Sequence, residues 1–152
     1  MDFHPLIVHF PLVCIILAAI FDGVAHFTHS DHYHKTGFAL LIAGALFMIP
    51  AAYTGEAAAE IARKIPLIEE GLRDHEDLST ITLWSALLLA VARIHLVARH
   101  RYLGNRKLIH MILVTACAGL VSWGAYTGGH LVYKFGAGTL PVRQNLLQQR
   151  TY

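Results

Sequence analysis

Charged residues are scarce in this chain of 152 residues, at 14% against about 25% in a typical soluble domain. Apolar residues take their place, making up 55% of the sequence and giving a mean hydropathy of +0.49. They occur in runs long enough to cross a bilayer, which requires about 20 residues of helix. The composition therefore excludes a soluble domain and indicates an integral membrane protein.

Cysteines, basic patches and catalytic motifs are also few or absent. Cys14 and Cys117 both lie inside apolar runs, where we expect buried thiols rather than a disulfide. No Cys-x-x-Cys-His occurs, which excludes covalent attachment of a c-type haem. The formal charge of +2, without a basic patch, gives no support for nucleic-acid binding. No hydrolase or phosphate-binding motif is present, so we expect a non-catalytic subunit.

Four apolar runs predict four membrane-spanning helices, because lipid cannot satisfy open backbone groups. Short connections at 27–36 and 99–107 make consecutive helices antiparallel neighbours. We therefore expect an all-α, integral membrane, antiparallel four-helix bundle over residues 1–138 and a polar exterior tail over 139–152, without an internal repeat. The second helix is expected to continue beyond the membrane towards Pro66. The spans run from Leu6 to His26, Gly37 to Tyr53, Leu78 to Ala98 and Leu108 to Leu131.

The charges of the connections predict the orientation in the membrane. The segment from Thr54 to Asp77 carries seven acidic residues and three basic ones. By the positive-inside rule the short connections are cytoplasmic, so both termini and the acidic segment face the exterior or periplasm of a bacterial inner membrane. The short connections instead carry Lys35, Arg99, Arg101, Arg106 and Lys107, opposed only by Asp31.

Two charged residues and six glycines fall within or beside the spans. Asp22 and Arg93 lie at similar depth near the cytoplasmic ends of their helices, and a charge in lipid normally has a partner. We expect a structural ion pair, the alternative being that both side chains extend to the interface. The glycines are expected to allow close approach of helices: Gly37, Gly44, Gly119, Gly124, Gly128 and Gly129.

Eleven histidines are the most unusual part of the composition, and several lie at the ends of the spans. Imidazole is a common ligand of metals and haem iron. The exterior layer consists of His4, His9, His75 and His130, with Tyr53 and Glu56 close enough to act behind the ligands. We expect one haem b, with His9 and His75 as the first pair of iron ligands and His4 or His130 in reserve. The alternative is that each is an ordinary interfacial histidine.

The cytoplasmic layer offers His26, His95 and His110 on helix ends, whereas His29, His32 and His34 are expected to face solvent. A haem in each layer would place the two irons roughly 25–30 Å apart, from 17–20 residues at 1.5 Å each. That separation is long for direct transfer, so one haem is favoured and two remain possible.

Three segments resemble a bacterial four-helix membrane family known as domain of unknown function 2231. They are the opening His4-Pro5-Leu6-Ile7-Val8-His9-Phe10-Pro11, the segment Ala51-Ala52-Tyr53-Thr54-Gly55-Glu56, and the close Tyr126-Thr127-Gly128-Gly129-His130-Leu131-Val132-Tyr133-Lys134-Phe135-Gly136. The resemblance covers about residues 4–138 and includes His75. It implies a four-span membrane protein, joined in some relatives to cytochrome c or other exported redox domains, but no settled activity. His130 occupies the variable position before Leu-Val-Tyr.

These observations lead to three hypotheses. The first is a membrane electron-transfer subunit that binds haem b at the exterior face and exchanges electrons with an exterior cytochrome c or a larger membrane complex. The second is a cofactor-free structural or assembly subunit of such a complex, using its glycine-rich faces. The third, a proton or metal-ion transporter, is the weakest, because no polar track through the spans and no repeat is expected.

Overall fold

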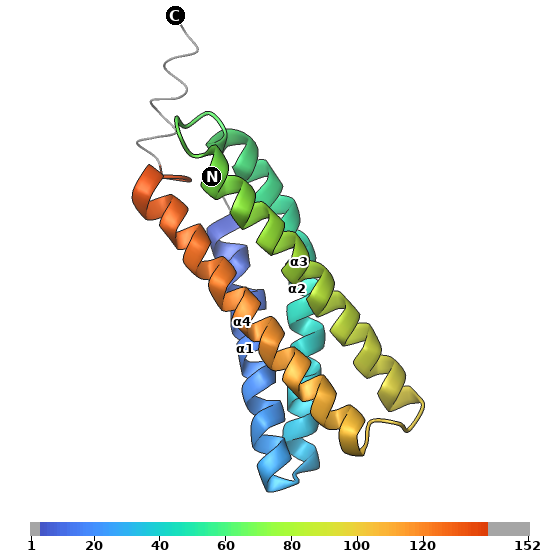
Figure 1. Ribbon diagram of the computed structural model, residues 1–152. Helices are drawn as coiled ribbons and strands as arrows, with labels where there is room; N and C mark the ends of the chain where they lie inside the picture. The colour runs from blue at the N-terminus through green and yellow to red at the C-terminus, as the bar shows by residue number, and fades with distance from the viewer. Residues whose placement is uncertain (1–3, 140–152) are drawn as a thin grey trace, which may run out of the picture.

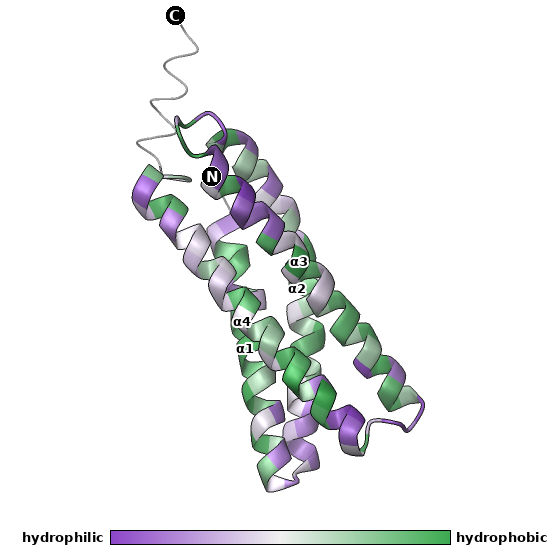
Figure 2. Cartoon of the chain, in the orientation of Figure 1, coloured by the Kyte–Doolittle hydropathy of each residue, from purple (hydrophilic) through white to green (hydrophobic). Residues whose placement is uncertain are grey.

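The computed structural model describes residues 4–139 and contains four helices joined by short connections (Figure 1). They are α1 (His4–Thr28), α2 (Asp31–Ala62), α3 (Glu69–Ala98) and α4 (Gly104–Phe135). All four are long and apolar enough to cross a membrane, and polar residues concentrate at the two ends (Figure 2). The all-α membrane bundle predicted from the sequence is confirmed.

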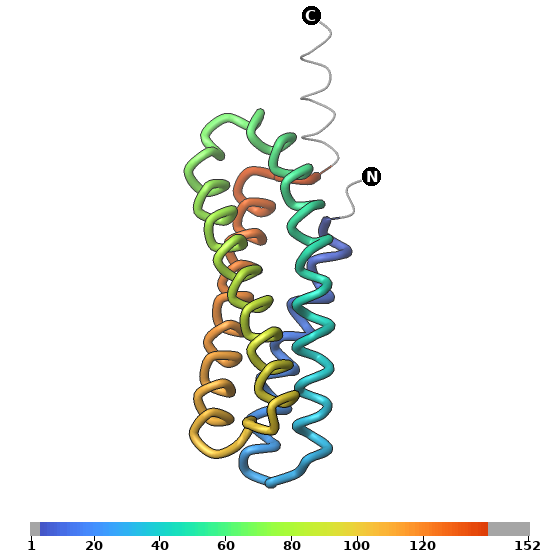
Figure 3. Tube along the Cα trace, turned by 90° about the vertical axis from the view of Figure 1, so that its right-hand side faces the viewer, coloured from blue at the N-terminus to red at the C-terminus, as the bar shows by residue number. Residues whose placement is uncertain are grey.

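The two ends of the bundle differ in which parts of the chain they hold (Figure 3). The terminal end holds His4, the α2–α3 connection at 63–68 and Phe135. The short-loop end holds the connections at 29–30 and 99–103. Each helix extends beyond the span expected from hydropathy, because hydropathy marks the apolar slab whereas backbone hydrogen bonding continues into the polar ends. The first connection therefore has two residues rather than the ten of 27–36.

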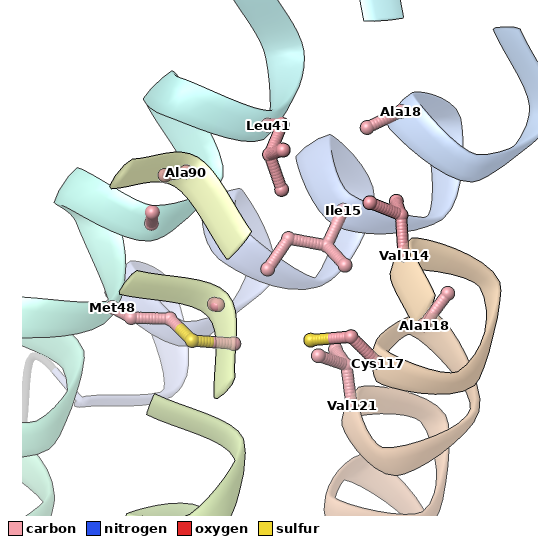
Figure 4. Packing of buried hydrophobic residues seen from close by; sticks show 11 residues of the cluster. Ile15, Ala18, Leu41, Met48, Ala90, Val114, Cys117, Ala118 and Val121 are labelled. Atoms are coloured by element: carbon pink, nitrogen blue, oxygen red, sulfur yellow. The ribbon is translucent and has the colours of Figure 1, made fainter. Parts of the chain in front are cut away.

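The four helices alternate around the bundle. The helix α1 packs against α2 and α4, and α3 packs against the same two, so α1 and α3 lie diagonally opposite. The central core joins all four, and Figure 4 shows Ile15 between Leu41 and Val114. A smaller apolar cluster lies at the terminal end and consists of Ala59, Ala62, Ile68, Leu72 and Leu131.

The closest helix pair, α1 with α2, is made possible by two glycines. A Cβ on Gly37 would lie 2.7 Å from Asp22 Oδ1, and one on Gly44 would lie 2.7 Å from Ile15 Cγ1. Small residues allow such backbone approach in membrane bundles, so their expected packing role is confirmed. The expectation is wrong for the second set: a Cβ on Gly119, Gly124 or Gly129 would meet nothing within 4 Å.

Candidate functional site

Two histidines from diagonally opposite helices lie at the terminal end of the bundle. His4 begins α1 and His75 lies in the second turn of α3, and both are half-buried. Nδ1 of His4 is 3.2 Å from the Thr54 hydroxyl on α2, and Nδ1 of His75 is 2.9 Å from the Thr127 hydroxyl on α4. The two imidazoles are close enough to interact electrostatically. The bundle thus brings together two rings that are 71 residues apart in the chain.

The threonines determine which ring nitrogen carries the proton. The Thr127 hydroxyl donates to Gly124 O at 3.0 Å, so towards His75 it is an acceptor. The Thr54 hydroxyl likewise donates to Pro50 O at 2.8 Å and accepts from His4. A neutral imidazole whose Nδ1–H donates has its lone pair on Nε2. Both rings are therefore held in the form that binds a metal through Nε2.

A glycine follows each threonine and accommodates the histidine ring. A Cβ on Gly55 would lie 3.1 Å from Cε1 of His4, and a Cβ on Gly128 would lie 3.1 Å from Cε1 of His75. Any side chain at either position would press on the imidazole. Thr-Gly is therefore one unit, in which the hydroxyl orients the ring and the missing side chain gives it room.

The matching contacts reveal an internal repeat of the helical hairpin. The segment Ala52-Tyr53-Thr54-Gly55 of α2 recurs 73 residues later as Ala125-Tyr126-Thr127-Gly128 of α4, the same interval that separates the first residues of the two helices. The interval of 71 residues between His4 and His75 also separates Asp22 from Arg93. It also relates the two connections at the short-loop end, where His29 and His100 both have positive φ, 53° and 52°. The expectation of no internal repeat is wrong, and the recurring Ala-Tyr-Thr-Gly is the sequence signal that reveals it.

The histidine layer also coincides with a break in the apolar core. The central core reaches Met48 on α2 and Val121 on α4, and the small cluster of the terminal end begins at Leu72 and Ala59. Imidazoles, hydroxyls and glycines occupy the level between them. This polar level between two apolar clusters marks the candidate site, which we call the histidine layer: His4, Thr54, Gly55, His75, Thr127 and Gly128.

The other residues predicted for the exterior site lie elsewhere. His9 is exposed, with its Nδ1 bonded to Pro5 O, and no hydrogen bond or ring contact joins it to His75. His130 is exposed and stacks on Tyr126, with 6.5 Å between the ring centroids. Tyr53 is 80% exposed. None of these three contributes to the histidine layer.

Glu56, also predicted behind the ligands, has a different partner. It accepts from Arg63 at 3.3 Å, and Arg63 also donates to Glu76 at 2.6 Å. The charge and hydrogen bond of Glu76 raise the pKa of Arg63. The ion pairs connect the end of α2 with the beginning of α3, so Glu56 belongs to the surface of the connection.

The predicted ion pair lies at the short-loop end, and its formation is confirmed. Arg93 donates to Asp22 through Nη1 and to His34 O through Nη2 at 2.8 Å. Asp22 is 0% exposed and Arg93 is 1% exposed, so the alternative in which both side chains extend to the interface is wrong. The guanidinium also lies over the ring of Tyr102, 4.7 Å from its centroid, a favourable cation–π arrangement.

Only one of the three histidines predicted for a cytoplasmic site joins this pair. His110 is buried, donates through Nε2 to Leu89 O at 3.0 Å and lies 5.6 Å from the ring of Tyr102. His26 contacts Phe27, and His95 is exposed. The expectation for His34 is wrong. Its side chain is 12% exposed and lies 3.6 Å from Asp22, because α2 begins before it and turns it inwards.

Comparisons with known proteins complete the description of the site. Residues 4–139 contain no group of three or more His, Cys, Asp or Glu that can hold a metal ion, so the histidine layer offers two protein ligands. No curated protein and no solved structure matches the chain. A family model described as a predicted membrane protein, domain of unknown function 2231, matches residues 1–141. With four apolar helices and this match over nearly its whole length, the chain belongs to that membrane-protein family.

Proposed function

We propose that this protein is a membrane electron-transfer subunit that binds haem b at the terminal end through His4 and His75. The observation that carries the proposal is the hydrogen bonding of the two rings. Each Nδ1–H donates to a threonine hydroxyl that cannot donate back, because that hydroxyl donates to its own helix. Nε2 of each ring thereby carries the lone pair, with the Ser79 hydroxyl 3.5 Å from Nε2 of His75, and orientation of this kind is typical of ligating histidines.

The residues of the histidine layer fit a haem in two respects. The two imidazoles come from opposite helices, so both could bind one iron between them. The apolar clusters above and below the layer would suit the largely apolar haem ring. The repeat also relates His4 to His75, so a ligand shared equally by both is favoured. A bound haem would supply one-electron oxidation and reduction of its iron, while Thr54 and Thr127 hold the imidazoles.

The ligand pair of this proposal differs from the first pair expected from the sequence. The sequence predicts His9 and His75 as the first pair, with His4 or His130 in reserve. His9 lies five residues after His4, which is about 140° around a helix of 3.6 residues per turn. The two residues therefore occupy different faces of α1, and His4 is the one that meets Thr54 on α2.

The orientation and partners of the subunit remain as the sequence predicts. With the short connections in the cytoplasm of a bacterial inner membrane, the histidine layer faces the periplasm. The acidic segment from Thr54 to Asp77 then lies beside the haem and attracts a basic protein through its field. An exterior cytochrome c, or a larger membrane complex in which this chain is one subunit, is the proposed electron partner. A second haem with His110 is not part of the proposal.

Absorption spectroscopy tests the proposal directly. The protein is purified in detergent with its native partners, and spectra are recorded oxidised and dithionite-reduced, together with a pyridine haemochrome assay. The expected result is the Soret and α bands of a b-type haem. Both bands should disappear in His4→Ala and in His75→Ala, because each variant removes one of the two proposed iron ligands. Matched controls are His9→Ala and His130→Ala, which remove exposed histidines from the same end and should leave the spectrum unchanged.

Each contrary result has a defined meaning. A featureless spectrum of the wild-type complex would overturn haem binding and favour the cofactor-free structural subunit. Loss of the bands in His9→Ala but not in His4→Ala would return the ligand role to His9. A featureless spectrum would also leave proton or metal-ion transport as an alternative, because the internal repeat that such transporters commonly have is present in this chain.

A further inference from the structure

A second polar cluster, at the short-loop end, is built from every helix of the bundle. It consists of Asp22 on α1, His34 on α2, Arg93 on α3, Tyr102 in the α3–α4 connection and His110 on α4. We call it the Asp–Arg cluster. Asp22, Arg93 and His110 are 0%, 1% and 3% exposed, respectively. The cluster is separate from the histidine layer and plays no part in the proposed function.

Several polar atoms of the cluster have no hydrogen-bond partner within the described chain. Each is shielded from solvent, and buried polar atoms without partners are strongly unfavourable. Five residues of the cluster contribute them. The atoms are Asp22 Oδ1, His34 Nδ1 and Nε2, Arg93 Nε, Tyr102 Oη and His110 Nδ1, of which Asp22 Oδ1 and His34 Nδ1 face each other at 3.6 Å, beyond hydrogen-bond distance.

The unpaired atoms include both donors and acceptors. Arg93 Nε, one nitrogen of His34 and the Tyr102 hydroxyl can donate. Asp22 Oδ1, the other nitrogen of His34 and His110 Nδ1 can accept. A ligand that satisfies this mixture must both donate and accept at short range. Water does so, and buried water characteristically makes about three hydrogen bonds to such groups.

The tautomer of His110 makes one acceptor chemically distinct. Its Nε2–H donates to Leu89 O at 3.0 Å, so in the neutral ring the lone pair is on Nδ1. That lone pair is one of the unpaired atoms of the cluster. Of the neutral acceptors here, an imidazole nitrogen is the most basic and is therefore the one that would take up a proton.

Tyr102 covers the cluster on the side of the short-loop end. Its ring lies under the Arg93 guanidinium, 5.6 Å from the ring of His110 and 6.1 Å from that of His34. Burial raises the pKa of Tyr102 to about 12, so its hydroxyl keeps its proton at neutral pH. The hydroxyl can therefore accept one hydrogen bond while it donates another, as a relay group must.

We propose that the Asp–Arg cluster is a hydrated proton-binding site, reached by water past Tyr102, in which Nδ1 of His110 takes up the proton. In the uptake step an O–H bond of hydronium breaks, the proton forms an N–H bond at Nδ1, and water is released. The ring becomes an imidazolium close to the Asp22–Arg93 ion pair, whose carboxylate attracts it and whose guanidinium repels it. The groups that act on the His110 ring are Asp22 from α1, Arg93 from α3 and Tyr102 from the connection, and His34 on α2, beside Asp22, also faces Lys107.

The test is nuclear magnetic resonance of the full chain in nanodiscs, with ¹⁵N-labelled histidine rings and a titration between about pH 5 and 8. The expected result is one histidine signal that changes from the neutral Nε2–H form to the doubly protonated form during the titration. This signal should be absent from the spectrum of His110→Gln. Cross-peaks between its ring and water are also expected. The matched control is His95→Gln, which removes an exposed histidine of the same end and should leave that signal in place.

Loss of folding in His110→Gln does not prevent the assignment. Tyr102→Leu removes the ring beside His110 and His34, so only those two histidines should shift, and His34→Gln then separates them. A His110 signal that stays neutral through the whole titration would overturn the proposal. A titrating His110 without water cross-peaks would overturn the hydrated path past Tyr102.

Discussion

The two ends of the bundle use the same diagonal helices, α1 and α3, in opposite ways. At the terminal end, equivalent positions hold the same residue: histidine faces histidine, and each has its threonine and glycine. At the short-loop end, equivalent positions hold complementary residues, Asp22 and Arg93.

The difference follows from what each pair must contact. Two identical histidines at equivalent positions suit the one shared ligand of the proposed haem site, because each supplies the same donor atom. Two identical charges in direct contact would repel at low dielectric. A direct buried contact between two charged side chains therefore favours opposite charges, and the two equivalent positions differ there.

The largest expected effect on stability comes from removing the Asp22–Arg93 ion pair at the short-loop end. Arg93→Leu leaves the Asp22 carboxylate buried without a partner, which should lower the free energy of unfolding by about 3–5 kcal/mol. Denaturant unfolding in detergent measures it. Arg101→Leu, which removes an exposed arginine of the neighbouring connection, is the control and should change little. Equal effects of the two variants would contradict the buried ion pair as a determinant of stability.

Glycine substitutions compare how closely α2 and α4 pack against their neighbouring helices. Gly37→Ala and Gly44→Ala each place a Cβ 2.7 Å from an atom of α1, and overpacking of this kind costs about 1–3 kcal/mol. Gly119→Ala on α4 meets no neighbour and should gain up to about 1 kcal/mol from helix propensity. Thermal unfolding of the three variants checks the order, and a destabilised Gly119→Ala would contradict it.

The symmetry of the histidine layer predicts matched effects. Thr54→Val and Thr127→Val each remove the acceptor of one Nδ1–H and should each cost about 1 kcal/mol of stability. In haem-loaded protein each should weaken cofactor affinity by about 10–100-fold, measured by haem transfer to an acceptor protein. Thr115→Val, at an exposed threonine bonded to its own helix, is the control. A large effect in only one of the pair would show that the ligand is not shared equally.

The smallest effect is expected at the α2–α3 connection. Arg63→Gln removes exposed ion pairs with Glu56 and Glu76, and such pairs contribute little and are screened by salt. The pKa of Arg63 is raised in the folded protein. The contribution of its ion pairs to the free energy of unfolding is therefore complete below the ordinary arginine pKa and is lost only at higher pH. Unfolding at neutral and mildly alkaline pH should show the same small difference. A difference that survives high salt would contradict this interpretation.

Hydropathy and charge were sufficient to predict the fold. Four apolar runs imply four helices, because lipid leaves the backbone no other arrangement, and the depth of Asp22 and Arg93 was sufficient to predict their pairing. The helix ends were less predictable, since residues 31–36 are polar yet continue α2. Hydropathy reports where the apolar slab lies and not where backbone hydrogen bonding stops.

The sequence predicts the depth of each residue in the membrane, but not whether its side of the helix faces a neighbouring helix. His4 and His9 both lie in the first two turns of α1, and only packing against α2 decides that His4 meets Thr54. His34 and His110 turn inwards whereas His95 does not, because the helix contacts determine which side is covered. The repeated Ala-Tyr-Thr-Gly was readable in the chain, whereas its pairing with His4 and His75 was not. The sequence by itself thus determined the membrane-spanning helices, their order and the level of each polar group. The tertiary structure alone decided which of those groups meet, because rotation about a helix axis is determined by packing against its neighbours.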